Sequence, residues 1–352
     1  MNKIFILVDA MRSDYISEKN TPFLHSLSKN YYYIKNIKPS LGFCERSEII
    51  SGQRSEKSGY FTAIGKNINK SDYRNLPHSF SKLIEYINFY FRKIPIITLF
   101  NKNLNFSKAL KKILNKYLRK KYKTNMPIYN IPLTQLMNFF LTEDEYDHFS
   151  KDFFKESNLV QKVKKKGMKI NNDAWTFLGN PNQMSDKEVM KFLIRKSVNN
   201  NEFIFAYLGI LDIVGHKYGP KSKEMYESLS KLDTFFEELI TANKDNDVVI
   251  LGDHGMKTIE KFFDISDELS LIKNKFDLKL NDNFNFFIDS TMLRLWVKKD
   301  IAPKIINYIN SNKLFNAHGK IINQKISEEI YGNVIWIANE GVMLYPDFFH
   351  FN

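Results

Sequence analysis

Acidic residues placed directly after short apolar runs constrain the fold of this chain more than any other feature. Each run has the length and the composition of a buried strand in a parallel sheet. The carboxyl ends of parallel strands form the edge of the sheet where sites are built, so we expect the acids at that edge. The runs and their acids are Lys3–Val8 (KIFILV) with Asp9, Asn201–Ile210 (NEFIFAYLGI) with Asp212, and Asn246–Leu251 (NDVVIL) with Asp253.

Helical patterns separate the runs. Lys221–Asn243 carries apolar residues at helical spacing between the second and the third run. Thr21–Leu27 has a proline just inside the start of a helix, the position that proline favours. Arg46–Ser51 resembles the first turns of a helix that Gly52 ends. Strands that alternate with helices predict an α/β fold with a mostly parallel sheet.

The alternation of strands and helices is interrupted between about residues 78 and 199. That stretch is helical in character and aromatic throughout, and Asn105–Lys123 has apolar residues at helical spacing with lysines on the other face. We therefore predict two domains: a metal-binding α/β core of residues 1–77 plus 200–352, and an inserted, mainly helical cap of residues 78–199. A lid over the active site and a segment on a membrane surface are both open roles for the cap.

The positive charge is concentrated in the cap. Residues 79–125 contain twelve Lys or Arg and one acid, Glu85, and so carry +11 of the net charge of +13. This segment could meet phosphates, anionic lipid or an anionic polymer, although no nucleic-acid motif accompanies it. Coding bias toward Lys, Asn, Ile and Phe is the alternative explanation, but it does not account for the missing acids.

Composition excludes several classes of protein. A single cysteine, Cys44, rules out an internal disulfide and a multi-cysteine zinc module. The first apolar run stops at Asp9 after five residues, which is too short for a secretory signal. No stretch approaches the ~20 apolar residues of a membrane span. These features predict a cytoplasmic location.

Histidines accompany two of the acids. Asp212 and His216 are four residues apart in LDIVGHKYGP, and Asp253 and His254 are adjacent in LGDHGM. Oxygen and nitrogen donors on rigid elements suit divalent zinc or manganese. Two such ions about 4 Å apart can clamp the attacking and the leaving oxygen in a phosphoryl transfer.

The motifs DAMRSDY, TPFLHSL, DIVGHKYGP and GDHGM together resemble the alkaline phosphatase superfamily, closest to its type I phosphodiesterase/nucleotide pyrophosphatase branch. The resemblance covers residues 1–65 and 200–260. It implies a three-layer α/β/α sandwich with two divalent metal ions, zinc or in some branches manganese. By resemblance, Asp9, Asp253 and His254 hold one ion, Asp212 and His216 hold the other, and Arg12 and Asp14 support them. A last histidine ligand near the C-terminus would be His318 or His350, or is absent.

The nucleophile departs from the family pattern. The superfamily places a Ser, Thr or modified Cys ten residues before the glycine that closes its helix, and here that position is Gly42. Neighbouring candidates are Ser40, Cys44 and Ser47, of which Cys44 is preferred because a helix N-terminus and a nearby metal both favour the thiolate. Arg46 matches an arginine of the sulfatase branch and would support the same loop. A water nucleophile stays open.

These features predict a two-metal phosphoryl-ester hydrolase that acts on phosphodiesters, with a phosphate-ester small molecule as substrate. Two alternatives remain: a phosphotransferase or sulfatase-like member of the same superfamily, and a metal-binding pseudoenzyme that docks an anionic partner. Substrate, metal identity, oligomeric state and the role of the cap are not determined by the sequence.

Overall fold

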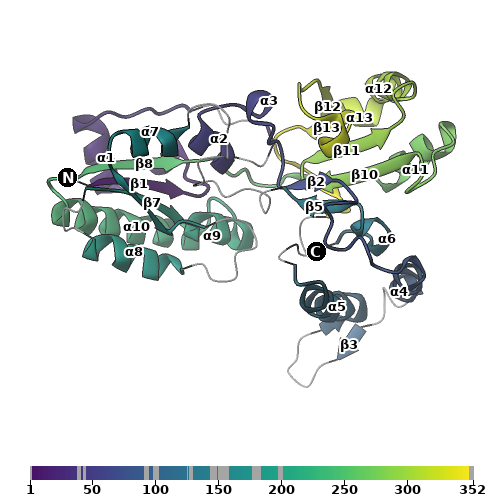
Figure 1. Ribbon diagram of the computed structural model, residues 1–352, viewed down its shortest axis with the longest axis horizontal. Coiled ribbons are helices and arrows are strands. Elements are labelled where there is room, and N and C mark those ends of the chain that lie inside the picture. Colours follow the sequence, from purple (N-terminus) through teal and green to yellow (C-terminus); the bar gives the residue numbers. More distant parts are fainter. Residues whose placement is uncertain are drawn as a thin grey trace. The chain divides into compact units, whose positions relative to one another are not determined.

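The computed structural model of the chain describes residues 2–37, 41–42, 45–90, 95–97, 103–124, 126, 130–142, 149, 158–176, 184–196 and 201–348. The chain forms two compact units, each built from two separate stretches (Figure 1). The first unit consists of Met1–Phe61 and Tyr146–Thr258, and the second of Thr62–Glu145 and Ile259–Asn352.

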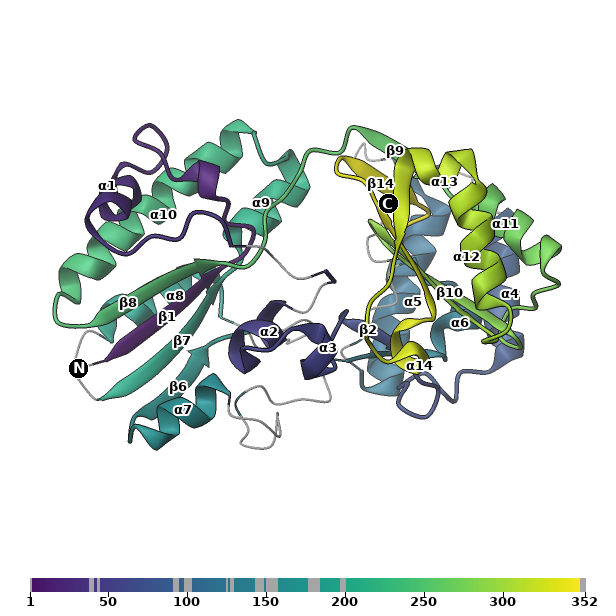
Figure 2. The same cartoon turned by 90° about the horizontal axis from the view of Figure 1, so that it is seen from above.

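A parallel sheet organises the first unit. Its strand order among the described residues is β6-β7-β1-β8, and all three pairings are parallel (Figure 2). Val8, the last residue of β1, pairs with Leu208 on one side and with Gly252 on the other. The strands are β1 (Lys3–Val8), β6 (Lys169–Ala174), β7 (Glu202–Leu208) and β8 (Asp247–Gly252).

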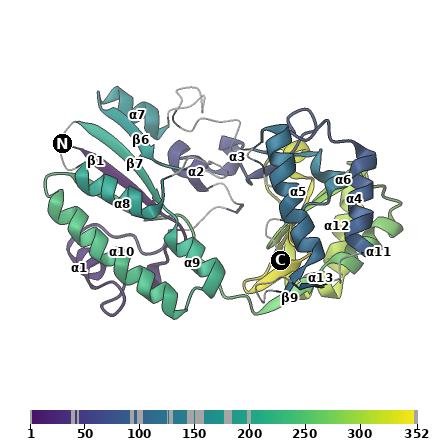
Figure 3. The same ribbon diagram turned by 90° about the horizontal axis from the view of Figure 1, so that it is seen from below.

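Helices cover both faces of this sheet because alternate side chains of β1 point to opposite sides. Ile4, Ile6 and Val8 pack in a core with residues of α1, α8, α9 and α10, while Phe5 and Leu7 pack with residues of α2 and α7. Figures 1 and 3 show α8 and α10 together on one side of the strands, and Figure 1 shows α7 on the other. The helices are α1 (Pro22–Asn30), α2 (Glu45–Ser51), α3 (Ser55–Ser58), α7 (Leu159–Lys165), α8 (Asp186–Arg195), α9 (Ile210–Tyr218) and α10 (Lys223–Ala242). The predicted three-layer α/β/α architecture is thereby confirmed.

An antiparallel sheet forms the centre of the second unit, with the order β10-β11-β13-β12. Its strands are β10 (Phe284–Asp289), β11 (Met292–Val297), β12 (Gly319–Ile322) and β13 (Val334–Ala338). Two-stranded sheets join β2 (Ile64–Lys66) to β5 (Phe139–Leu141), β3 (Pro95–Ile97) to β4 (Asn103–Asn105), and β9 (Lys261–Asp264) to β14 (Val342–Tyr345). The helices are α4 (His78–Tyr90), α5 (Phe106–Tyr122), α6 (Leu133–Leu136), α11 (Ser266–Lys275), α12 (Ala302–Ser311), α13 (Lys313–His318) and α14 (Glu328–Tyr331).

A buried ion pair ties the two stretches of the second unit together. Arg294 is fully buried, and its Nε donates to Asp289 Oδ2 at 2.8 Å. Its Nη1 donates to the carbonyl oxygen of Ile64 at 2.8 Å. The side chain therefore joins the antiparallel sheet to β2, which belongs to the other stretch of sequence.

This division differs from the expected core of residues 1–77 plus 200–352 with a cap of residues 78–199. The C-terminal stretch does not extend the parallel sheet, because its strands form a separate antiparallel sheet that packs with residues 62–145. Residues 158–196 in turn belong to the parallel-sheet unit, where they supply β6, α7 and α8. Among the described residues, no helix is both long enough and apolar enough to cross a bilayer.

Candidate metal centre

The register of the parallel sheet aligns the ends of its three central strands. Asp9 follows β1 directly, and its amide donates to the carbonyl oxygen of Leu208 at the end of β7, at 2.9 Å. Ala10 has a left-handed backbone with φ of 59°, which turns the chain sharply after Asp9. Asp253 follows β8, and its Oδ1 accepts from the amides of Ala10 at 3.1 Å and His254 at 2.7 Å. Asp253 thus fixes the relative position of the two loops.

Three side chains converge at this edge: Asp9, Asp212 and His254. One donor atom from each lies within 4.8 Å of the others. Asp212 reaches the group because α9 begins two residues after the end of β7. The start of α9 is held by Asp186, whose carboxylate accepts from the amide of Gly209 at 3.1 Å.

The two carboxylate oxygens of Asp9 have different surroundings. Oδ2 accepts a hydrogen bond from the Tyr207 hydroxyl and lies 3.9 Å from Nη2 of Arg46, whose guanidinium stacks 4.6 Å from the centre of the Tyr207 ring. Oδ1 is buried and accepts no hydrogen bond of good geometry from the described residues. Burial opposes ionisation, but contacts with His254, Tyr207 and Arg46 outweigh it and lower the pKa of Asp9.

The His254 ring faces the buried oxygen. Its Nδ1 lies 2.9 Å from the carbonyl oxygen of Gly255, so Nδ1 carries the proton in the neutral ring. Nε2 lies 3.0 Å from Asp9 Oδ1, which sets two lone pairs against each other unless a cation or a proton lies between them. Burial by itself lowers the pKa of His254, but Asp9, Asp253 and Glu45 raise it to about 10. The position attracts positive charge.

These observations fit a divalent cation. Two carboxylates and an imidazole nitrogen are the donor set that zinc and manganese accept. A cation would satisfy the buried oxygen of Asp9, and the bond from Nδ1 to Gly255 is the kind of outer contact that orients a histidine ligand. Burial raises the pKa of Asp253, with a further contribution from Asp9, and burial raises the pKa of Glu45 to about 7. Uncompensated negative charge is therefore costly at this edge.

His216 lies one turn after Asp212 on α9. Its Nε2 is 3.2 Å from Asp212 Oδ1, and this hydrogen bond raises the pKa of His216. The predicted spacing therefore does place both donors on one helical face, with the imidazole half exposed. In this structure Asp212 joins Asp9 and His254, whereas the resemblance grouped Asp9 and His254 with Asp253.

Arg12 and Asp14 form an ion pair beside the site. The guanidinium of Arg12 donates to both carboxylate oxygens of Asp14, at 2.8 and 2.7 Å. It also donates to the carbonyl oxygen of Met256. This ion pair, through the bond from Arg12 to Met256, connects the loop after β1 to the loop after β8.

The nucleophile candidates are only partly described. Cys44, Ser40 and His350 lie outside the described residues. Ser47 is buried within α2. Gly42 has φ of 107°, and a Cβ atom built on it would lie 2.0 Å from the carbonyl oxygen of Phe61. The position that carries the nucleophile in the superfamily therefore has no room for a side chain here.

His318 ends α13 in the second unit. Its side chain is buried, its ring stacks on Phe263 at 4.5 Å, and its Nδ1 contacts the carbonyl oxygen of Leu314 at 2.8 Å. These contacts account for a buried histidine without a metal ion.

Tyr207 and Asp186 are site residues that the sequence did not indicate. Tyr207 lies inside an aromatic strand, where an aromatic residue is ordinary, and only the register of β7 against β1 turns its hydroxyl toward Asp9. Asp186 begins α8, as acids often do, and its contact with Gly209 spans 23 residues. The order of apolar and polar residues carries no signal for either contact.

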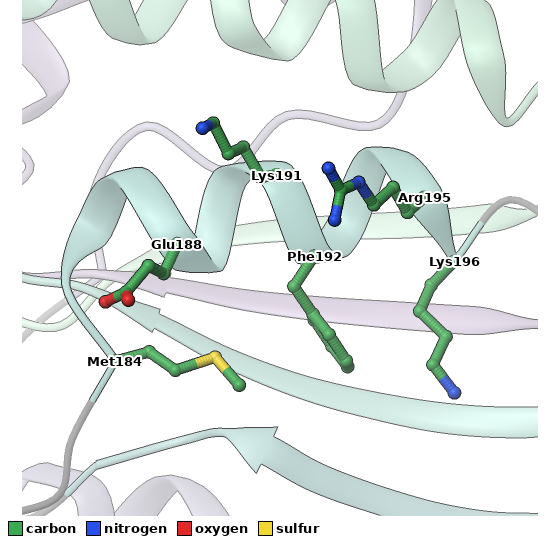
Figure 4. A pocket seen from close by; sticks show the side chains of 6 residues that line it. All are labelled: Met184, Glu188, Lys191, Phe192, Arg195 and Lys196. Carbon is green, nitrogen blue, oxygen red and sulfur yellow. The ribbon is translucent and has the colours of Figure 1, made fainter.

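A separate open hollow runs along α8 and has a volume of about 410 Å³. Its lining residues are Met184, Glu188, Lys191, Phe192, Arg195 and Lys196 (Figure 4). Figure 4 shows Lys191 and Arg195 on one side of the helix and Phe192 and Lys196 on the other, so the cations do not converge on one point. The hollow shares no residue with the candidate metal centre.

Comparison with known sequences decides the family. The sequence profile described as type I phosphodiesterase/nucleotide pyrophosphatase matches residues 3–305. The chain belongs to this family. The predicted membership of the alkaline phosphatase superfamily, in its phosphodiesterase branch, is thereby confirmed.

Curated members of the phosphodiesterase group and of a transferase group match shorter segments. GPI ethanolamine phosphate transferase 2 of Candida albicans is 30% identical over 149 residues, which cover 40% of this chain and 16% of that protein. Venom phosphodiesterase CdcPDE of Crotalus durissus collilineatus is 31% identical over 107 residues, or 29% of this chain and 12% of that protein. GPI ethanolamine phosphate transferase 3 of Eremothecium gossypii is 50% identical over 50 residues, which cover 14% of this chain and 5% of that protein. The matched segments therefore span a small part of each relative.

Solved structures of family members share the fold. Murine ectonucleotide pyrophosphatase/phosphodiesterase 5 superposes with a TM-score of 0.59 and 13% identity, covering 99% of this chain and 81% of that one. An inactive variant of the murine protein in complex with AMP gives the same values. This likeness establishes the alkaline phosphatase-like α/β fold.

Proposed function

We propose that this member of the phosphodiesterase family is a metal-dependent hydrolase of phosphodiester bonds, with nucleotide-like phosphate esters as its substrate class. The observation that carries the proposal is the convergence of Asp9, Asp212 and His254, in which Nε2 of His254 lies 3.0 Å from the buried Oδ1 of Asp9. The AMP bound to the murine relative supports a nucleoside phosphate as ligand.

The residues of this chain would divide the work as follows. Asp9, Asp212 and His254 would hold one divalent cation, and His216 and Asp253 are our candidates for ligands of a second one. Bound metal ions polarise phosphoryl oxygens and stabilise the charge that develops on them. Tyr207 orients Asp9 by its hydroxyl, and Arg46 adds a fixed positive charge next to the same carboxylate. Zinc is our first choice of metal, with manganese as the alternative.

Cys44 remains our candidate for the nucleophile, with a water molecule as the alternative. Gly42 has no side chain that could attack phosphorus, and a larger residue at this position would collide with Phe61. A Cys44→Ala variant separates the two mechanisms: it abolishes turnover through a covalent intermediate and spares attack by water.

A chromogenic panel tests the proposed activity. Purified protein with added zinc or manganese is offered an aryl phosphodiester, an aryl phosphomonoester and an aryl sulfate, with chelator as the control. We expect chelator-sensitive turnover of the diester, and a loss of about 10³-fold or more in the His254→Ala variant. The His78→Ala variant, which removes an exposed histidine of α4, is expected to keep full activity.

The outcomes of the panel discriminate between the proposals. Diester turnover that survives the chelator contradicts the metal-dependent mechanism. Bound metal with no turnover of any ester contradicts hydrolysis and favours a metal-binding protein that docks an anionic partner. Turnover of the sulfate alone favours the sulfatase-like alternative.

A phosphotransferase is the second candidate, and the transferase names of several curated relatives favour it. Hydrolysis and transfer differ only in whether water or an alcohol receives the phosphoryl group. We would supply a short alcohol together with the diester substrate and measure both products. A transferase yields mainly the new diester in which the added alcohol has replaced the aryl alcohol, whereas a hydrolase yields mainly the phosphomonoester and the free aryl alcohol.

A further inference from the structure

Helix α5 presents an exposed face made of two adjacent rows of side chains. One row contains Lys112, Lys116 and Lys120, and the next contains Ile113, Tyr117 and Lys121, each at a spacing of four residues. Ile113 is 67% exposed and Tyr117 is 54% exposed, and all four lysines are exposed. Seen from below in Figure 3, α5 lies on the near side of the second unit.

The opposite side of the helix is anchored, so the exposed face cannot turn inward. Leu118 is fully buried. The Tyr122 ring packs edge-on against Tyr73 at 5.5 Å, and its hydroxyl donates to the carbonyl oxygen of Asn75 at 3.4 Å. A partner of α5 must therefore meet the lysines together with Ile113 and Tyr117, rather than the apolar row that is already packed.

Within the described part of the chain, no ion pair between an acid and these lysines is present. The sequence of α5 contains no Asp or Glu. Glu85 of α4, the single acid of residues 79–125, is engaged elsewhere, because it accepts from the amide and the hydroxyl of Thr134 at 2.8 and 3.0 Å. Asp72 accepts from the hydroxyl of Thr124. The exposed face of α5 is left with a net charge of +4.

We propose that the exposed face of α5 docks on an anionic lipid bilayer. Lysines are compact cations suited to a diffuse anionic surface, whereas planar recognition of individual phosphates favours arginine. Ile113 cannot stack on a nucleic-acid base, but an aliphatic side chain flanked by lysines inserts at the level of lipid headgroups. Tyrosine is enriched at the same interface. The six side chains lie between Lys112 and Lys121, a span of about 14 Å along the helix axis.

Co-sedimentation of the full chain with vesicles tests the proposal. The vesicles contain phosphatidylcholine with about a third phosphatidylserine, and pure phosphatidylcholine serves as the neutral reference. We expect binding to the anionic vesicles only, weakening as salt is added. Replacing Lys112, Lys116, Lys120 and Lys121 by Gln should reduce the partition coefficient at least ~10-fold, since each lysine near the surface contributes about fivefold.

Matched variants separate position from overall charge. Replacing Lys162, Lys164, Lys165 and Lys166, four exposed lysines at α7, by Gln removes the same charge from another helix and should leave binding within about twofold of the parent. The Ile113→Ser/Tyr117→Ser double variant should bind the anionic vesicles several-fold less tightly. Its control is Leu271→Ser/Leu314→Ser, which changes two apolar residues that are about half exposed. The thermal midpoint of every variant is measured to show that it folds.

Two results would overturn the proposal. Equal losses from the α5 and the α7 lysine variants would mean that net charge alone governs binding. Unchanged vesicle binding by the Ile113/Tyr117 variant, together with equally tight binding of the parent to a soluble anionic polymer, would assign the face to a polyanion instead of a bilayer.

Discussion

The two carboxylate oxygens of Asp9 have different neighbours. Tyr207 and Arg46 lie against Oδ2, whereas Oδ1 lies 3.0 Å from Nε2 of His254. A carboxylate that is held in this way presents one oxygen to a cation in a fixed direction. In the proposed metal centre, contacts behind the ligands would therefore affect metal affinity together with the ligands themselves.

Removing the Tyr207 hydroxyl tests this arrangement. We expect Tyr207→Phe to weaken the affinity for zinc or manganese by about 10- to 100-fold, because Asp9 loses the bond that orients it. Competition against a chelating dye measures the affinity. Tyr31→Phe, which alters a hydroxyl on an exposed ring, is the control. Equal affinities of the two variants would show that the hydroxyl does not position the ligand.

Two glycines with left-handed backbones should respond differently to a methyl group. A Cβ on Gly42 would lie 2.0 Å from a backbone oxygen, whereas a Cβ on Gly52 meets nothing within 4 Å. Gly52→Ala should cost about 1 kcal/mol through backbone strain alone. Gly42→Ala should cost clearly more, because the chain near Phe61 must also move. Chemical denaturation of both variants provides the comparison, and equal costs would contradict the described packing around Gly42.

At the scale of elements, the sequence predicted most of the site's framework. Lys3–Val8 is β1 with the predicted bounds, and the strands before Asp212 and Asp253 begin and end within two residues of their predicted limits. Buried parallel strands are continuous apolar runs bounded by polar residues, so they can be recognised from the linear sequence. The helix before Gly52 was also found, because glycine at a left-handed position is a local signal.

Features that depend on pairing between distant segments were not predictable in the same way. The two units differ from the predicted core and cap because β10 and β11 resemble any apolar strand, and nothing local states which sheet they join. Tyr207 and Asp186 were missed for the same reason.

The start of α9 gives an element-level prediction. Asp186→Ala removes the acceptor for the Gly209 amide and should destabilise the protein by about 1 kcal/mol. It should also weaken metal binding, because α9 carries Asp212. Asp264→Ala is the matched control, since Asp264 accepts from the Ser266 amide at the start of α11 in the second unit. That variant should lose comparable stability and keep its metal affinity; a parallel loss of affinity would refute the link through α9.

For the whole molecule, two units with separate cores predict two separable unfolding transitions. Metal bound at a hundred times its dissociation constant should raise the stability of the first unit by about 2.7 kcal/mol and leave the second unchanged. Scanning calorimetry with and without chelator measures this. A single transition that shifts as a whole would contradict independent units.

The second unit should respond to a change at Arg294. Arg294→Met leaves Asp289 buried without its partner and should destabilise this unit by about 3–5 kcal/mol at neutral pH. Burial already raises the pKa of Asp289 to about 6. Folding then favours the protonated carboxyl, so the penalty should shrink as the pH falls from 8 to 5. Calorimetry at both pH values provides the test, and a penalty that grows in acid would contradict the assignment.

The order of strands in the parallel sheet has a consequence for biosynthesis. β1 is the first strand of the sheet to leave the ribosome, but both of its neighbours, β7 and β8, follow about 200 residues later. At roughly 5–20 residues per second, KIFILV therefore waits about 10–40 s with both edges unpaired. The proposed cation can bind only after His254 has emerged. The nascent chain should accordingly depend on chaperones that shield exposed strands, and should acquire its cation as a late step of maturation.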